Sequence, residues 1–290
     1  MKKPASTNLP LCIIGGFPRG GTTFLYHYLS QHPEVFAPSR KEINYFSVYH
    51  ERGVDWYNSL FEEMKGESLG IDVSPFYFLD QKSIQRILQE APEAKIILSI
   101  RKPSEMVCAM YAQISTSSLA IPSIENFIES YHWNIGSGLT ICLREFPFYD
   151  RIKEYQKAFG DNLLYYSFEE FEFNPLVILQ RIENHLELNA FFNNDNFNNH
   201  IINASERRNS RLLSLLLRQE RLIDTIVKLL PRKAILKARG VFLESSKPRN
   251  QGKKARLNPD HLRIAHELLY NEDEKVMSLF NPKDFITRNK

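Results

Sequence analysis

Short apolar runs alternate with amphipathic stretches along the first two thirds of the chain. A fully buried strand has a continuous apolar run, whereas a helix repeats its apolar positions every three or four residues. The strands that this pattern predicts are Leu11–Ile14, Leu69–Val73, Ala94–Ile100 and Leu163–Ser167. The helices that it predicts are Thr23–Gln31, Gln81–Glu90, Ser104–Gln113 and Pro175–His185. This alternation predicts an α/β fold, in which a parallel sheet has helices on both faces.

The last third of the chain predicts helices and no strand. Residues Arg211–Leu230 have the spacing of a long amphipathic helix, and Pro259–Phe280 form a second helical region. We expect the second region to be interrupted near Asn271. The polar stretch Glu244–Arg256 is rich in Lys and Arg and predicts a loop.

Positive charge is concentrated in one part of the chain. Residues 203–257 hold fifteen Lys and Arg against four Asp and Glu, whereas the whole chain has a net charge of only +3. Such a segment could face an acceptor, a nucleotide or a membrane surface, or form a lid. We expect a single domain over residues 1–290 with a flexible arm over residues 1–9 and this basic, helical and loop segment.

Composition excludes several classes of protein. No apolar run approaches the roughly 20 residues that span a bilayer, and no apolar signal-peptide core follows the N-terminal MKKPASTNLP. Cys12, Cys108 and Cys142 are too few and too scattered for a disulfide framework or a metal site. We therefore expect a soluble, cytoplasmic protein that binds no metal. Peripheral membrane contact and the oligomeric state are left open.

The stretch GFPRGGTT at residues 16–23 lies between a predicted strand and a predicted helix. A glycine-rich turn at a helix N-terminus exposes backbone N–H groups and binds anions. The pattern nearly matches a nucleotide-triphosphate loop, but Thr22 occupies the position of its lysine, which argues against a kinase. It could also be a simple turn. The candidate anion ligands are Arg19, Gly20, Gly21, Thr22 and Thr23.

The longer stretch PRGGTTFLYHYLSQHP resembles the 5′-phosphosulfate loop of the PAPS-dependent sulfotransferase family. The resemblance implies a fold like that of nucleotide kinases, with PAPS (3′-phosphoadenosine 5′-phosphosulfate) as sulfuryl donor, PAP as product and no metal. Because PAPS has no γ-phosphate, the lysine is not needed, and the resemblance places the basic residue at Arg19 instead.

Downstream, SRKEINYFSVYHERGVDWYNSLF resembles the glycan branch of the family, which includes heparan sulfate N- and O-sulfotransferases and bacterial relatives. The resemblance implies that Glu42, followed by Tyr45 and Phe46, is the catalytic base. Otherwise Glu42 is a surface carboxylate paired with Lys41 or Arg40. Lys41 is a candidate substrate residue that could steer the anionic end of the donor, or it is simply solvated.

A second anion site is implied where Arg101, Lys102 and Pro103 follow a predicted strand. This element resembles the family's 3′-phosphate site and makes Arg101 a donor ligand. The family normally has a serine eight residues later, where this chain has Ala109, and Ser115, Thr116 or the basic loop could substitute. A loop resembling the family's Gly- and Lys-rich loop adds the candidates Lys253, Lys254 and Arg256.

The stretch IDVSPFYF resembles a strand and Ser-Pro-x-Tyr segment of the family. Relatives in the glycan branch often carry a lysine where this chain has Val73, so a role for that lysine does not transfer. Asp72, Ser74 and Tyr77 are candidates for the acceptor side. Alternatively, this proline- and aromatic-rich segment only packs a loop.

These resemblances imply an enzyme that transfers a sulfuryl group from PAPS to a hydroxyl or amine, with a carbohydrate as the expected acceptor. In this in-line displacement Glu42 takes the acceptor proton, and Arg19 with the loop N–H groups stabilises the leaving phosphate. The alternatives are a nucleotide kinase, a lipid or polyketide-like acceptor, and a binding protein whose basic residues 207–256 recognise a membrane or an acidic polymer. Nucleic-acid binding is not expected, because aromatic and basic residues do not interleave as in stacking platforms.

Overall fold

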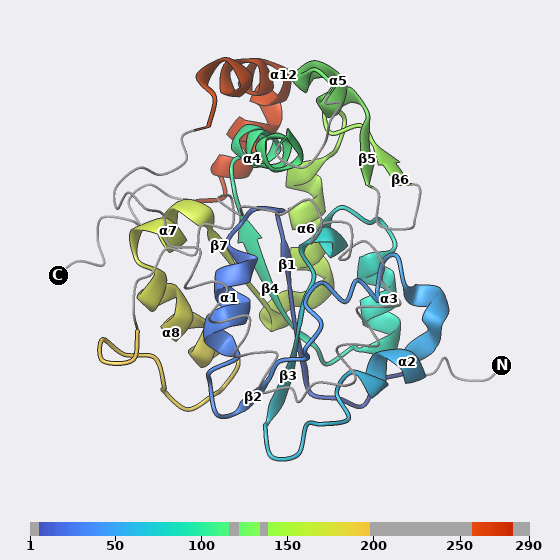
Figure 1. Ribbon diagram of the computed structural model, residues 1–290, viewed down its shortest axis with the longest axis vertical. Coiled ribbons are helices and arrows are strands. Elements are labelled where there is room, and N and C mark those ends of the chain that lie inside the picture. The colour runs from blue at the N-terminus through green and yellow to red at the C-terminus, as the bar shows by residue number, and fades with distance from the viewer. Residues whose placement is uncertain (1–5, 116–121, 134–138, 198–256, 281–290) are drawn as a thin grey trace, which may run out of the picture.

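Five parallel strands form the central sheet of the computed structural model, which describes residues 6–115, 122–133, 139–197 and 257–280 (Figure 1). The sheet has the order β2-β3-β1-β4-β7, and every neighbouring pair is parallel. Its strands are β1 (Leu11–Gly16), β2 (Val35–Phe36), β3 (Leu69–Val73), β4 (Lys95–Ile100) and β7 (Leu163–Ser167). The chain passes from β1 to β2 and β3 on one side, and then crosses to β4 on the other. Ligands of open α/β sheets bind at the carboxyl ends of strands where the order reverses in this way, here at β1.

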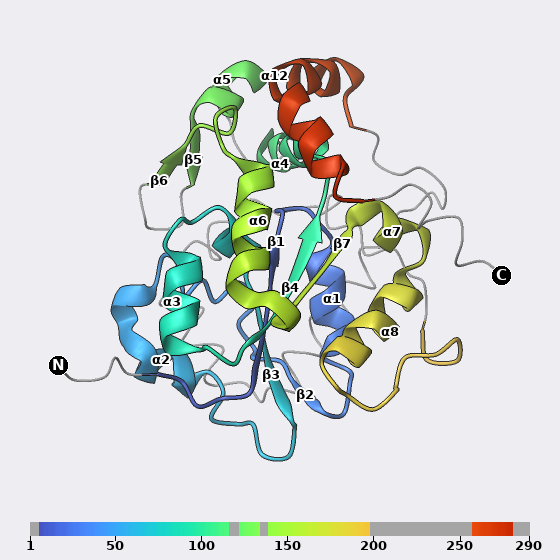
Figure 2. The same ribbon diagram turned by 180° about the vertical axis from the view of Figure 1, so that it is seen from behind.

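Helices cover both faces of the sheet. Alternate residues of β1 point to opposite sides, and those on each side are apolar, so each face is buried against helices. Cys12 and Ile14 pack in a core with α1, α7 and α8, whereas Ile13 packs in a core with α3 and α6. Figure 1 shows the first group in front of the sheet, and Figure 2, which views the molecule from the opposite side, shows α3 and α6 in front of it. These helices are α1 (Thr22–Leu29), α3 (Ser83–Glu90), α6 (Phe148–Phe159), α7 (Phe168–Phe173) and α8 (Pro175–His185).

A further group of elements lies beyond the carboxyl end of β4, at the top of Figure 1. Here the C-terminal helix packs against α4, and both contact α5, so the last described helix joins the sheet's upper edge. A two-stranded antiparallel hairpin follows α5. The elements are α4 (Pro103–Ser115), α5 (Ile124–Glu129), β5 (Tyr131–Trp133), β6 (Leu139–Ile141) and α12 (Pro259–Met277).

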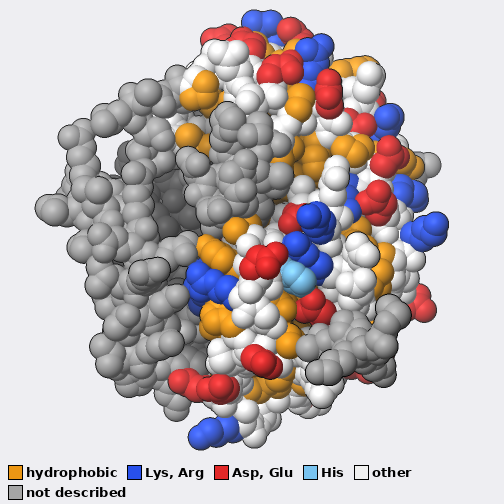
Figure 3. Space-filling view, turned by 90° about the vertical axis from the view of Figure 1, so that its right-hand side faces the viewer, with side chains coloured by type: hydrophobic (Ala, Val, Ile, Leu, Met, Phe, Trp, Pro, Cys, Tyr) orange, Lys and Arg blue, Asp and Glu red, His pale blue; other side chains and the backbone are white. Residues whose placement is uncertain are grey.

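Short helices complete the segment between β2 and α3. They are η1 (His50–Arg52), α2 (Gly53–Ser59) and η2 (Pro75–Phe78). On the face that carries α2, α3 and the hairpin, acidic, basic and apolar side chains are interspersed, and Lys and Arg gather beside a histidine near its middle (Figure 3). Among the described helices, none has both the length and the apolarity needed to cross a lipid bilayer.

The α/β fold and its four predicted strands are confirmed, and α8 has the predicted bounds. The predicted interruption near Asn271 is wrong, because α12 runs unbroken to Met277. Ala265, Leu269 and Val276 are all buried on one stripe of this helix, so its packing outweighs the weak helix propensity of a single exposed asparagine.

Two other expectations concern the ends of the chain. The arm expected over residues 1–9 is fixed at Thr7, which is buried and donates its backbone N–H to Glu90 O at 2.7 Å. The predicted helix Arg211–Leu230 and the predicted loop Glu244–Arg256 lie outside the described residues.

Candidate active site

The loop between β1 and α1 is held by Ser99 of β4. The backbone oxygen of Ser99 accepts from Phe17 N at 2.8 Å, and its hydroxyl donates to Gly20 O. A Cβ atom at Gly20 would lie 2.7 Å from Ser99 Oγ and 2.9 Å from Phe17 O, so only glycine fits. The loop is therefore tied to the neighbouring strand at both of its ends.

The loop leads directly into α1. Gly21 is the N-cap of this helix with φ of 82°, a left-handed conformation that glycine adopts without strain. The helix starts at Thr22 and Thr23, whose backbone N–H groups have no acceptor within a helix. N–H groups at a helix N-terminus, together with the helix dipole, favour the binding of an anion, and here they lie at the switch point of the sheet. The geometry thus fits the predicted phosphosulfate loop.

Glu42 lies at the carboxyl end of the next strand. Its backbone N–H donates to Val73 O at 3.0 Å, and Val73 pairs with Ile14 of β1, two residues before the loop begins. Neighbouring strands are about 4.8 Å apart, so Glu42 and the anion loop occupy the same edge of the sheet. The structure thus brings the two predicted catalytic elements together.

The carboxylate of Glu42 is partly exposed, with 39% of the side chain accessible, and pairs with Lys41 Nζ at 3.1 Å. The alternative to a catalytic role was that Glu42 is a surface carboxylate paired with Lys41 or Arg40, and the pair with Lys41 is present. Burial, with the charge of Glu42 as the second cause, raises the pKa of Tyr131 to about 12. The Tyr131 phenol of β5 therefore stays protonated near Glu42. Sequence analysis did not select this tyrosine, because only the fold brings the hairpin to this edge.

Backbone strain coincides with the two predicted catalytic residues. Among the described non-glycine residues, only Arg19, Glu42, Asn44 and Glu187 have positive φ, with 65° at Arg19 and 60° at Glu42. Such conformations cost of order 1–3 kcal/mol and persist where the surrounding contacts enforce them, which is common at active sites.

The residues predicted for the acceptor side lie inside the protein. Asp72, Ser74 and Tyr77 have no accessible surface. Ser74 Oγ and Tyr77 OH each donate to the Asp72 carboxylate at 2.6 Å. Burial raises the pKa of Asp72 to about 6, and these hydrogen bonds oppose the shift. Direct contact of these side chains with an acceptor stays a prediction, and the contacts seen here are internal.

Arg101 follows β4 at the same edge of the sheet. Its Nε and Nη2 donate to Glu105 Oε2 at 3.2 and 3.0 Å, and its guanidinium lies 4.6 Å from the centre of the Phe168 ring. Arg101 is thus an ion-paired edge residue within the predicted 3′-phosphate element. Of the proposed replacements for the missing serine, Ser115 donates its hydroxyl to Tyr111 O at 2.7 Å. Thr116, Lys253, Lys254 and Arg256 lie outside the described residues.

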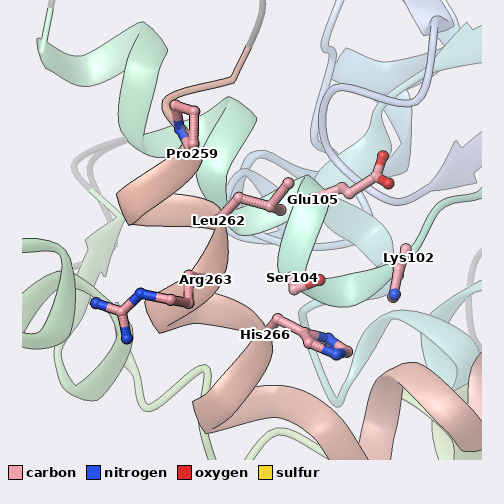
Figure 4. Close-up of a pocket in the computed structure, with 7 residues that line it drawn as sticks. All are labelled: Lys102, Ser104, Glu105, Pro259, Leu262, Arg263 and His266. Atoms are coloured by element: carbon pink, nitrogen blue, oxygen red, sulfur yellow. The ribbon is translucent and has the colours of Figure 1, made fainter.

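A groove of about 340 Å³ lies between α4 and α12, and its lining begins at Lys102, the residue after Arg101. Figure 4 shows Arg263 pointing away from Lys102 and His266. The groove is lined by Lys102, Ser104, Glu105, Pro259, Leu262, Arg263 and His266.

Behind this groove, the fully buried Asp273 of α12 accepts from Ser104 N at 2.9 Å and contacts His266 Nδ1 at 2.7 Å. Asp273 thereby caps the N-terminus of α4, the helix that follows Arg101. Sequence analysis missed this role, although an acidic residue on the buried stripe of a predicted helix was the available signal.

A parallel sheet with a glycine-containing loop between its first strand and first helix, at the switch point, defines this chain as an α/β protein with a P-loop-like fold. Residues 10–211 match the model of the sulfotransferase domain family, so the chain belongs to that family.

Two curated relatives extend the comparison over part of the chain. The chain is 36% identical over 106 residues to the membrane-associated sulfotransferase kil1 of Dictyostelium discoideum, covering 36% of this chain and 22% of that protein. It is 31% identical over 120 residues to human heparan sulfate glucosamine 3-O-sulfotransferase 6, covering 41% of this chain and 35% of the relative. The chain therefore spans well under half the length of these relatives.

Among solved structures, the fold is similar to that of a sulfotransferase from Alicyclobacillus acidocaldarius. The two chains superpose with a TM-score of 0.54 at 20% identity, covering 77% of this chain and 97% of the other. This likeness supports the fold.

Proposed function

We propose that this chain is a PAPS-dependent sulfotransferase that transfers a sulfuryl group to a hydroxyl or amine, and that its acceptor is a carbohydrate. One observation carries the proposal: the anion loop and Glu42 lie at the carboxyl ends of adjacent strands, joined through Ile14, Val73 and the bond from Glu42 N to Val73 O. Membership of the family gives this juxtaposition its chemical meaning.

In the proposed reaction the loop N–H groups, the N-terminus of α1 and Arg19 hold the 5′-phosphosulfate. The acceptor oxygen or nitrogen attacks sulfur while the bond from sulfur to the phosphate oxygen breaks. Glu42 takes the acceptor proton, and the loop stabilises the charge that grows on the departing phosphate. Arg101, with Lys253 and Lys254, would hold the 3′-phosphate. Lys41 would steer the anionic donor.

The carbohydrate acceptor is supported by similarity to the glycan branch, which includes human heparan sulfate glucosamine 3-O-sulfotransferase 6. The match covers only part of that relative, so the acceptor is the finer part of the proposal. A lipid or polyketide-like hydroxyl is the alternative. Cytoplasmic location and a single domain over residues 1–290 likewise stay predictions.

Two measurements test the proposal. Thermal unfolding with PAP, and separately with ATP and Mg²⁺, distinguishes donor classes, since a ligand at about 100 times its Kd stabilises by about 2.7 kcal/mol. A response to PAP alone supports the proposal, and a response to ATP alone contradicts it. Incubation with ³⁵S-labelled PAPS and separate glycan, lipid and phenol pools then identifies the acceptor. Label in the lipid pool alone would overturn the carbohydrate assignment and leave the donor assignment intact.

A further inference from the structure

The backbone around Glu42 is held from beneath by a buried hydrogen-bond network. We call residues 42–46 the Glu42 segment. Ser74 Oγ accepts from Asn44 N at 3.0 Å, and Tyr77 OH accepts from Phe46 N at 3.4 Å. Two of the five backbone N–H groups of the segment are therefore satisfied by hydroxyls that follow β3.

Both hydroxyls are themselves oriented by one carboxylate. Ser74 Oγ donates to Asp72 Oδ1 at 2.6 Å, and Tyr77 OH donates to Asp72 Oδ2 at 2.6 Å. A hydroxyl has a single proton, so donation to Asp72 turns its lone pairs toward the backbone N–H groups. The carboxylate therefore sets the direction of both hydrogen bonds to the Glu42 segment.

This arrangement explains how the strained backbone of the segment is maintained. Glu42 and Asn44 have φ of 60° and 54°, conformations that non-glycine residues adopt only under constraint. Helix α3 constrains the end of the segment, where Ser83 Oγ donates to Phe46 O at 3.1 Å. The bond from Glu42 N to Val73 O constrains its beginning. The Asp72 network constrains the residues between.

We propose that Asp72 is a positioning residue for Glu42, acting through the hydroxyls of Ser74 and Tyr77. The inference rests on the proposed function, in which Glu42 is the base. Asp72 itself is buried beneath the segment and does not touch the reacting atoms. Its role is to keep the Glu42 backbone in the one conformation that presents the carboxylate at the edge of the sheet.

The chain offers a matched pair of variants. Tyr57 OH also approaches Asp72 Oδ2, at 3.3 Å, and Tyr57 is as fully buried as Tyr77. Of these two tyrosines, only Tyr77 has a hydroxyl that accepts a hydrogen bond from the Glu42 segment among the described residues. Tyr77→Phe and Tyr57→Phe therefore remove the same group from the same carboxylate, with different expected consequences for the segment.

The test combines hydrogen exchange with kinetics. In Ser74→Ala, exchange of the peptide covering residues 42–47 should accelerate about tenfold and kcat should fall about tenfold, with KM for PAPS within about twofold, since one hydrogen bond contributes roughly a factor of ten. Tyr77→Phe should show the same changes to a smaller extent, because its bond to the segment is longer. Tyr57→Phe should change neither quantity by more than about twofold.

The outcomes separate the two proposals. If Tyr77→Phe and Tyr57→Phe behave alike, or if Ser74→Ala leaves exchange unchanged, the positioning role is wrong. If Glu42→Gln keeps full turnover while Ser74→Ala accelerates exchange, the network is right and the base assignment is wrong. Thermal unfolding of each variant checks that the measured protein is folded. Ser74→Ala and Tyr77→Phe provide two independent tests should one of them fail to fold.

Discussion

Replacing Asp72 by asparagine is expected to change how the stability of the protein depends on pH. Burial raises the pKa of the Asp72 carboxyl from its ordinary value of 3.8 to about 6, although three hydroxyls donate to it and oppose this shift. The folded protein therefore keeps a proton on Asp72 over a pH range in which the unfolded chain has lost it. Stability rises with pH only where the unfolded state binds more protons, and here the folded state binds more.

The contribution of Asp72 to the free energy of unfolding is thus fully present below about pH 4 and declines as the pH rises to about 6. At 1.36 kcal/mol per pKa unit, the shift from 3.8 to about 6 corresponds to a decline of about 3 kcal/mol. This is a large fraction of the 5–15 kcal/mol that typically stabilises a folded protein. The same ionisation creates the acceptor that orients Ser74 and Tyr77, so the network costs stability at neutral pH.

Urea unfolding of the wild type and of Asp72→Asn between pH 4 and pH 7.5 measures this effect. Asparagine does not titrate. The measured quantity is the free energy of unfolding of the wild type minus that of the variant, and in this difference the contributions of the other titrating groups cancel. We expect this difference to fall by about 2–3 kcal/mol as the pH rises from 4 to 7.5. A difference that is constant with pH, or that increases, would refute the burial argument for Asp72.

Two other predictions concern the loop and the α4 cap. Gly20→Ala would place a Cβ atom 2.7 Å from Ser99 Oγ. Overpacking of this kind costs about 1–3 kcal/mol, so the Kd for PAP, measured by calorimetry, should rise about tenfold or more. An unchanged Kd would argue against the loop as the donor site. Asp273→Ala removes the partner of Ser104 N and should lower the free energy of unfolding by about 2–4 kcal/mol. Exposed Glu274→Ala on the same helix should stay within about 0.5 kcal/mol by urea unfolding, and equal losses in both variants would contradict the cap.

The larger part of the sheet could be predicted from the sequence, because buried parallel strands have continuous apolar runs that a single pass finds. Strand β2, only two residues long, has no such run. Helix α6 was missed although its buried residues Phe148, Ile152, Tyr155 and Phe159 have clear helical spacing. The weak helix propensity of Asn271 predicted an interruption of the last helix, but packing of its buried stripe keeps α12 continuous. Apart from α6, whose pattern was present in the sequence, the errors arise where an element is very short, as at β2, or where packing outweighs local preference, as at Asn271.

The candidate site divides in the same way. The glycine loop and Glu42 carry local motifs, so they could be selected from the sequence, and the fold places them at one edge. Ser99, Tyr131 and Asp273 act through contacts with residues far away in the chain, which no local pattern encodes. Ser99 and Asp273 did leave a weaker signal, since each is a polar residue within an otherwise buried stripe.

The central claim is that the loop binds the donor while Glu42 acts on the acceptor. The most direct test is ³⁵S transfer from PAPS to the identified acceptor by Glu42→Gln, with the Kd for PAP measured on the same protein and exposed Glu51→Gln as control. The account predicts a Kd within about twofold of wild type and transfer reduced by about 10²–10⁴-fold, the range typical of a lost general base. Wild-type transfer rates in Glu42→Gln, or equal losses in both variants, would contradict it.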